Sequence, residues 1–103
     1  MHLRVDASGA VTLDDPDDCT SFSITGVAPS SAAVEAAVRA SGIELCDGAT
    51  HGYVAPDVVV LLAEGRVGEG WAERFDGMVR FAGSKGWLDG SGRIRGHTDW
   101  SAG

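Results

Sequence analysis

The hydrophobic pattern is clearest between Trp71 and Gly86. Apolar side chains recur there at a helical spacing, in the order Trp71, Phe75, Met78, Val79 and Ala82. This spacing predicts a long amphipathic helix that packs one face on a core, with Gly86 as the left-handed residue that ends it. Trp71 and Trp87 flank this helix, and we expect both to close its ends onto the core.

Two glycines, Gly77 and Gly83, lie inside the predicted helix. Glycine in a helix costs about 1 kcal/mol relative to alanine, so packing must compensate. We therefore expect at least one of them to mark a close approach to another element or to a second subunit.

Polar and apolar residues alternate at the beginning and in the middle of the chain. Residues 2–6 and 10–13 alternate on either side of a glycine-containing turn and predict a β-hairpin. Residues 20–25 predict a third strand and residues 50–54 a further one, whereas residues 43–46 form either a short strand or a simple return from the preceding helix.

Two more stretches carry helix signals. The alanine-rich stretch Pro29–Gly42 has a proline suited to the first helical turn and a glycine suited to the C-terminal cap. The stretch Pro56–Glu64 has a proline and an aspartate at its start, yet its core, Val58 to Leu62, has the β-branched content of a buried strand. We predict a helix for Pro56–Glu64 and keep the strand as the alternative.

The last alternating stretch runs from Arg93 to Trp100 and predicts a strand with two different faces. One face carries Ile94, Gly96, Thr98 and Trp100, and the other carries Arg93, Arg95, His97 and Asp99. We expect this strand to pair with the N-terminal hairpin or to form an edge of the sheet. An edge strand that ends in an exposed tryptophan favours a homodimer.

Together these elements predict one α+β domain over residues 1–103. Four to five mostly antiparallel strands pack against one long helix and one or two shorter helices.

Composition narrows the class of protein. The chain has 103 residues, of which 44% are hydrophobic and 22% charged, and its net charge is −7. This balance is typical of a folded domain, and the acidity argues against nucleic-acid binding because clustered Lys and Arg are absent. No apolar run approaches the length of a membrane span and no signal-peptide pattern opens the chain, so we expect a cytoplasmic protein that does not bind membranes.

The polar face of the last strand offers the best candidate chemistry. Arg93 and Arg95 are candidates for binding a carboxylate or phosphate. His97 and His51 are candidate acid–base groups, and Asp99 is placed to orient His97. A solvated strand face produces the same alternation without any function, and we weigh that interpretation more heavily.

Metal, cofactor and thiol chemistry find little support in the sequence. The run Asp14–Asp18 invites a calcium interpretation but lacks the glycine and distal glutamate of a calcium loop, so we expect no metal and no cofactor. Cys19 and Cys46 have no basic neighbour in sequence that would activate a thiol, and we expect both to be free.

Two functions from different classes remain. The first is a non-catalytic accessory or binding protein that recognises a protein partner or a small anionic ligand through its acidic surface or through the face of Arg93, Arg95 and His97. The alternative is a small enzyme that acts on an anionic metabolite by His-mediated proton transfer.

Overall fold

The computed structural model describes residues 1–101 and contains six strands and three helices in that range. Along the chain they are β1 (His2–Val5), β2 (Val11–Asp14), β3 (Ser23–Val27), α1 (Ala32–Ala40), β4 (Ile43–Cys46), β5 (His51–Val54), α2 (Pro56–Ala63), α3 (Trp71–Ser84) and β6 (Ile94–Ser101). The α+β class is confirmed. The predicted strand number of four to five is too low, because both 43–46 and 50–54 contribute strands.

All six strands form one mixed sheet in the order β2-β1-β3-β6-β5-β4. β1 pairs parallel to β3 and β3 parallel to β6, while the β1–β2, β5–β6 and β4–β5 pairs are antiparallel. The predicted place of the last strand is therefore wrong. β6 lies in the middle of the sheet between β3 and β5, so the edge-strand argument for a homodimer no longer applies.

Two glycines explain how β6 takes a central place. Gly96 on β6 lies opposite Gly52 on β5. A Cβ added at Gly96 would meet the Phe22 ring at 3.0 Å, and one added at Gly52 would meet the Ile24 side chain at 2.9 Å. The missing side chains make room for Phe22 and Ile24, which cover the middle of the sheet.

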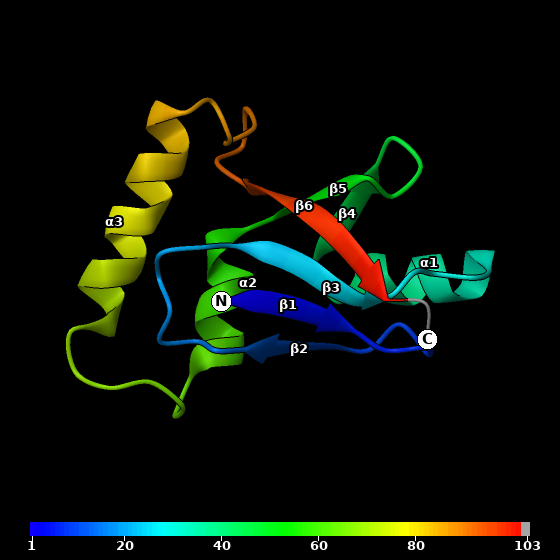
Figure 1. Ribbon diagram of the computed structural model, residues 1–103, viewed down its shortest axis with the longest axis horizontal. Helices are drawn as coiled ribbons and strands as arrows, with labels where there is room; N and C mark the ends of the chain where they lie inside the picture. The colour runs from blue at the N-terminus through cyan, green and yellow to red at the C-terminus, as the bar shows by residue number, and fades with distance from the viewer. Residues whose placement is uncertain (102–103) are drawn as a thin grey trace.

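Helices cover one face of the sheet and leave the other open. In Figure 1, α1 and α2 lie behind the strands, and α3 stands at one end of the sheet, beside the start of β6. The alternation predicted for the hairpin is confirmed, since Leu3, Val5 and Leu13 are fully buried. Among residues 1–101 no helix combines the length and apolarity that a membrane crossing needs.

The two shorter helices follow their terminal signals. α1 starts later than predicted, because the Oγ of Ser31 accepts a hydrogen bond from the backbone N–H of Val34 at 3.2 Å and caps the helix there. The ambiguous segment is a helix, as predicted, with Pro56 as its first residue. Within its apolar run Val59 and Ala63 are buried, whereas Val60 and Leu61 are exposed.

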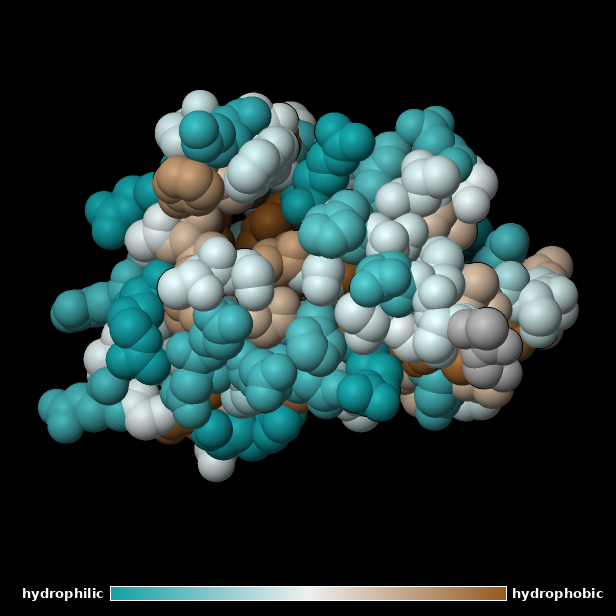
Figure 2. Space-filling view, in the orientation of Figure 1, coloured by the Kyte–Doolittle hydropathy of each residue, from teal (hydrophilic) through white to brown (hydrophobic). Residues whose placement is uncertain are grey.

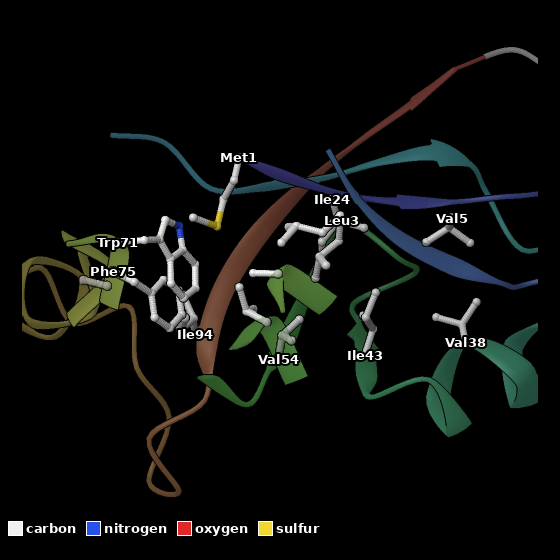
Figure 3. Packing of buried hydrophobic residues seen from close by; sticks show 14 residues of the cluster. Met1, Leu3, Val5, Ile24, Val38, Ile43, Val54, Trp71, Phe75 and Ile94 are labelled. Carbon is white, nitrogen blue, oxygen red and sulfur yellow. The ribbon is translucent and has the colours of Figure 1, made fainter. Parts of the chain in front are cut away.

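The long helix α3 buries its two large aromatic side chains in its first two turns and Ala82 in its last turn. Trp71 and Phe75 are buried and stack with ring centroids 4.9 Å apart. Figure 3 shows both side chains at the end of the core where Met1 and Ile94 also lie. The indole N–H of Trp71 donates to the carbonyl oxygen of Pro16 at 2.6 Å. Trp71 thus closes the start of the helix as predicted.

The two glycines of α3 differ in their surroundings. A Cβ at Gly83 would lie 3.2 Å from the Leu88 side chain, so Gly83 marks the close approach expected from the sequence. A Cβ at Gly77 would meet nothing within 4 Å. Gly77 therefore faces open space.

We predict that Gly26→Ala strongly destabilises the sheet. Gly26 has a φ of +109°, and a Cβ there would lie 2.1 Å from the carbonyl oxygen of Val5 on the neighbouring strand. Backbone strain and the steric clash together should lower the free energy of unfolding in urea by about 2 kcal/mol or more. Gly90→Ala is the control, since nothing lies within 4 Å of the added Cβ. Equal stability of the two variants would contradict this account of the β1–β3 pair.

Candidate functional site

The polar side chains of β6 share one face, as predicted, but they do not form one site. Arg95, His97 and Asp99 are exposed on the open face of the sheet, and Arg93 just before the strand is half-buried. Within residues 1–101, no hydrogen bond or ion pair joins Asp99 to His97. The predicted orienting role of Asp99 therefore has no geometric support.

Arg93 is already held by carboxylates of this chain. Its Nε lies 2.6 Å from Oδ2 of Asp89 and its Nη1 lies 2.9 Å from Oε2 of Glu44. These hydrogen bonds, with Glu44 contributing most, raise the pKa of the Arg93 guanidinium above its usual value. The side chain ties the turn before β6 to the edge strand β4, so its charge is satisfied without an external anion.

His51 and His97 are brought together by the strand register. They are direct partners across β5 and β6. The neighbouring pair is hydrogen-bonded through the N–H of Thr98 and the carbonyl of Thr50 at 3.2 Å. The histidines therefore form a non-hydrogen-bonded pair, in which the Cα atoms are about 4.5 Å apart. The alternation of polar and apolar residues in the sequence predicts which face of the sheet each histidine lies on. The strand register is needed to show that His51 and His97 are neighbours.

The third histidine, which the sequence analysis did not single out, lies in the same row. His2 on β1 is level with Ser23 on β3, which is level with His97. The side chain of His51 is 12% exposed, with the ring of Tyr53 edge-on at 5.6 Å and Oδ2 of Asp47 at 3.8 Å from its Nδ1. In the described part of the chain, no group of three or more His, Cys, Asp or Glu is arranged to hold a metal ion.

A groove beside α3 gathers the side chains that most resemble a binding surface. One stripe of the helix, with Arg74, Gly77, Met78 and Phe81, faces the segment 17–20 across a cleft of about 460 Å³. The cleft continues into a narrower recess of about 80 Å³, which is lined by Phe22, Ile94, Trp87 and Arg95 among others. In Figure 2, a hollow with a brown floor is visible between α3 and the start of β6. We call this surface the α3 groove.

Two large aromatic side chains stand over the narrow end of the α3 groove. Phe81 is 55% exposed and Trp87 is 44% exposed, and their rings meet edge to face with centroids 6.0 Å apart. The prediction that Trp87 closes the helix end onto the core is therefore wrong. Leu88, the next residue, packs near Gly83 instead and leaves Trp87 at the surface. An apolar surface of this kind on a folded domain is typical of an interaction site.

Basic groups lie beside the aromatic pair. The Nζ of Lys85 is 5.5 Å from the centre of the Phe81 ring. Arg95 lines the narrow recess, and neither it nor Lys85 forms an ion pair within residues 1–101. At the wide end, by contrast, Arg74 lies 3.4 Å from Asp17. The wide end also carries Asp18, so the cations without an ion-pair partner in the described residues lie at the narrow end.

In the acidic loop before β3, Asp18 forms hydrogen bonds and an ion pair with nearby residues of the chain. Asp18 accepts hydrogen bonds from the hydroxyl and the N–H of Thr20, and its carboxylate lies 3.7 Å from the amine of Met1. These contacts, with the hydroxyl of Thr20 first, lower the pKa of Asp18 to about 2. The residue is thus ionised in all but strongly acidic solution.

The two cysteines are free, as predicted. Cys19 lines the wide end of the α3 groove, where burial is the main cause of the raised pKa of its thiol. A thiol with a raised pKa is a poor nucleophile at neutral pH, so the groove offers apolar surface and charge rather than a reactive group.

Comparisons with protein-family models, with curated proteins and with solved structures give no match for this chain. The geometry of the site therefore carries the functional argument.

We predict that the stability difference between the wild-type protein and Asp18→Asn depends on pH. The folded pKa of Asp18, about 2, lies below the ordinary aspartate pKa of 3.8. The carboxylate thus stabilises the folded state above about pH 4, and this contribution disappears as the pH falls towards 2. Urea unfolding should show Asp18→Asn less stable than wild type at pH 6 and the two converging near pH 2. If the stability difference between the two proteins stays constant with pH, the hydrogen bonds from Thr20 do not stabilise the ionised carboxylate of Asp18.

Proposed function

We propose that this chain is a binding protein that holds an acidic, apolar-anchored segment of a protein partner in the α3 groove. The observation that carries the proposal is the exposed pair Phe81 and Trp87 over an apolar recess, beside two cations that have no ion-pair partner within residues 1–101. Shape, polarity and charge each support this occupant.

The apolar part of the argument concerns the floor and walls of the groove. Phe22, Met78 and Ile94 form apolar lining beneath the two exposed aromatic rings. Aromatic residues, Met and Arg are the types enriched in the buried centres of protein interfaces. An aliphatic or aromatic side chain of a partner would remove these surfaces from water and would serve as the anchor.

The electrostatic part concerns where the positive charge lies. The chain carries a net charge of −7, yet Lys85 lies over the Phe81 ring and Arg95 lines the narrow recess, and neither has a carboxylate partner in the described residues. A carboxylate next to the apolar anchor would meet these cations, and the acidic remainder of the surface would repel a strongly acidic protein that lacks the anchor.

The length of the groove fits a short segment. Its helical stripe runs from Arg74 to Phe81, which is about 10 Å along the helix axis. An extended peptide covers this distance with about three residues. The groove therefore suits a short linear segment rather than a large flat interface.

The enzymatic alternative has weaker support. It requires an arginine that anchors an anion and a histidine that moves a proton within one pocket. Arg95 lines the narrow recess, but His51 and His97 are not among the residues that line the groove, and Arg93 is bound to Asp89 and Glu44. A second copy of this chain is another occupant, and the test below distinguishes it.

We predict that selection from a library of displayed random peptides yields binders with an aliphatic or aromatic residue next to Asp or Glu. Trp87→Ala should weaken these peptides by about tenfold or more, because a central aromatic carries much of an interface energy. Arg95→Glu should weaken them and favour basic sequences. Leu61→Ala is the matched control, since Leu61 is 69% exposed on α2, outside the groove. Selected peptides that are basic, or that bind Trp87→Ala as tightly as they bind wild type, would contradict the proposal. Dimerisation that depends on concentration and is abolished by Trp87→Ala would also contradict it, and would identify a second copy of the chain as the occupant of the groove.

We predict further that Gly77→Gln separates stability from binding. Glutamine is a better helix former than glycine, and nothing lies within 4 Å of the added Cβ, so the free energy of unfolding should rise by about 0.5–1 kcal/mol. The longer side chain should at the same time occupy the groove and weaken the selected peptides. Urea unfolding and fluorescence polarisation measure the two effects. A more stable variant with unchanged peptide affinity would show that the peptides bind elsewhere.

A further inference from the structure

A second cleft lies away from the α3 groove. Its volume is about 580 Å³, within the range of small-molecule sites. It lies between α1, the edge strand β4, the turn 47–49 and the end of β6. Residues just after β3 complete it, so the cleft is outside the carboxyl ends of β3 and β6, two neighbouring parallel strands. Ligands of open parallel sheets bind at such positions.

One wall of the cleft is apolar and held in place. Trp100 is half-buried, and its indole N–H donates to the carbonyl oxygen of Ala49 at 2.9 Å. The hydroxyl of Thr98 donates to the same oxygen at 2.6 Å. Ile43 and Leu45 continue the apolar lining along β4. The indole is thus positioned before any ligand arrives, which lowers the entropic cost of binding.

The polar groups of the cleft have an excess of negative charge. Glu35 and Arg39 lie one turn apart on α1, and no ion pair within residues 1–101 involves either of them. Asp47 projects from the opposite turn, with only the ring of His51 at 3.8 Å. Glu44 also lines the cleft but is neutralised by Arg93. Two carboxylates therefore face the cleft against one cation.

The geometry points to a binding site for a small organic cation with an apolar body, such as an aryl-alkyl amine. The apolar body packs against Trp100 and the β4 side chains, and the ammonium group lies between Glu35 and Asp47. This site is independent of the α3 groove, so the two proposals stand or fall separately.

Three probes of matched shape test the charge preference: 2-phenylethylamine, 2-phenylethanol and phenylacetate. Each is titrated into the ¹⁵N-labelled full chain, and the indole N–H signal of Trp100 and the amide signals of Glu35 and Asp47 are followed. We predict a saturable shift with the amine and a several-fold weaker response with the alcohol and the acid. No saturable shift with the amine, or equal binding of the neutral or anionic probe, overturns the proposal.

Variants at exposed positions assign the charge to named residues. Glu35→Gln and Asp47→Asn should each weaken the amine about three- to tenfold, through loss of a charge-assisted hydrogen bond. Asparagine suits position 47, where φ is +49°. Arg39→Gln should strengthen binding, because it removes a like charge. Glu73→Gln on α3 is the control, and unchanged affinity in both Glu35→Gln and Asp47→Asn overturns the assignment.

The thiol of Cys46 supplies a second readout, since it lines the same cleft. In a Cys19→Ser background, saturating 2-phenylethylamine should slow alkylation of Cys46 by iodoacetamide at least twofold, while 2-phenylethanol should not. Unchanged alkylation under amine saturation would contradict a ligand in this cleft.

Discussion

The burial of Trp71 and Phe75 at the start of α3 is the constraint on which the functional surface depends. Trp71 and Phe75 are buried against the core, and the Trp71 indole is hydrogen-bonded to the loop before β3. Further along the helix, the stripe that contains Met78 and Phe81 lines a cleft. The helix therefore acts as one wall of a groove whose other walls are the loop before β3 and the start of β6.

The same sheet separates two kinds of surface. Helices cover one face, while the open face carries the row of His2, His97 and His51, which parallel and antiparallel pairings bring level. The α3 groove lies at the end of the sheet where β6 begins, and the larger cleft lies where β6 ends. One central strand thus contributes Arg95 to the first site and Trp100 to the second. Its central position, made possible by Gly96 and Gly52, places both sites on a rigid element.

Local sequence signals predicted the elements better than their arrangement. The spacing of Trp71, Phe75 and Ala82 indicates which helix face is buried, and Pro56 identifies the start of α2. Alternation in β6 correctly separates its two faces. It does not distinguish a central strand with one wet face from an edge strand, because both have the same period, so the predicted edge position was wrong. Parallel pairing of β1, β3 and β6 leaves no local mark in the sequence.

The site was harder to predict than the fold for a related reason. Arg93 was a candidate anion anchor, but Glu44, 49 positions away in sequence, neutralises it. Trp87 was expected in the core, and only the packing of Leu88 beside Gly83 shows that it stays at the surface. One sequence signal for the groove was Gly77, a glycine inside a helix. No other element packs closely against it, and it lines the groove instead.

The central claim is that the exposed aromatic pair of the α3 groove receives an apolar side chain of an acidic partner. A crystal structure of the protein with a selected acidic peptide tests it most directly. The account predicts peptide density along α3, with the apolar anchor against Phe81 and Trp87 and a carboxylate beside Arg95 or Lys85. A peptide seated on α2, on the histidine row or in the cleft at Trp100, with the α3 groove empty, would contradict it.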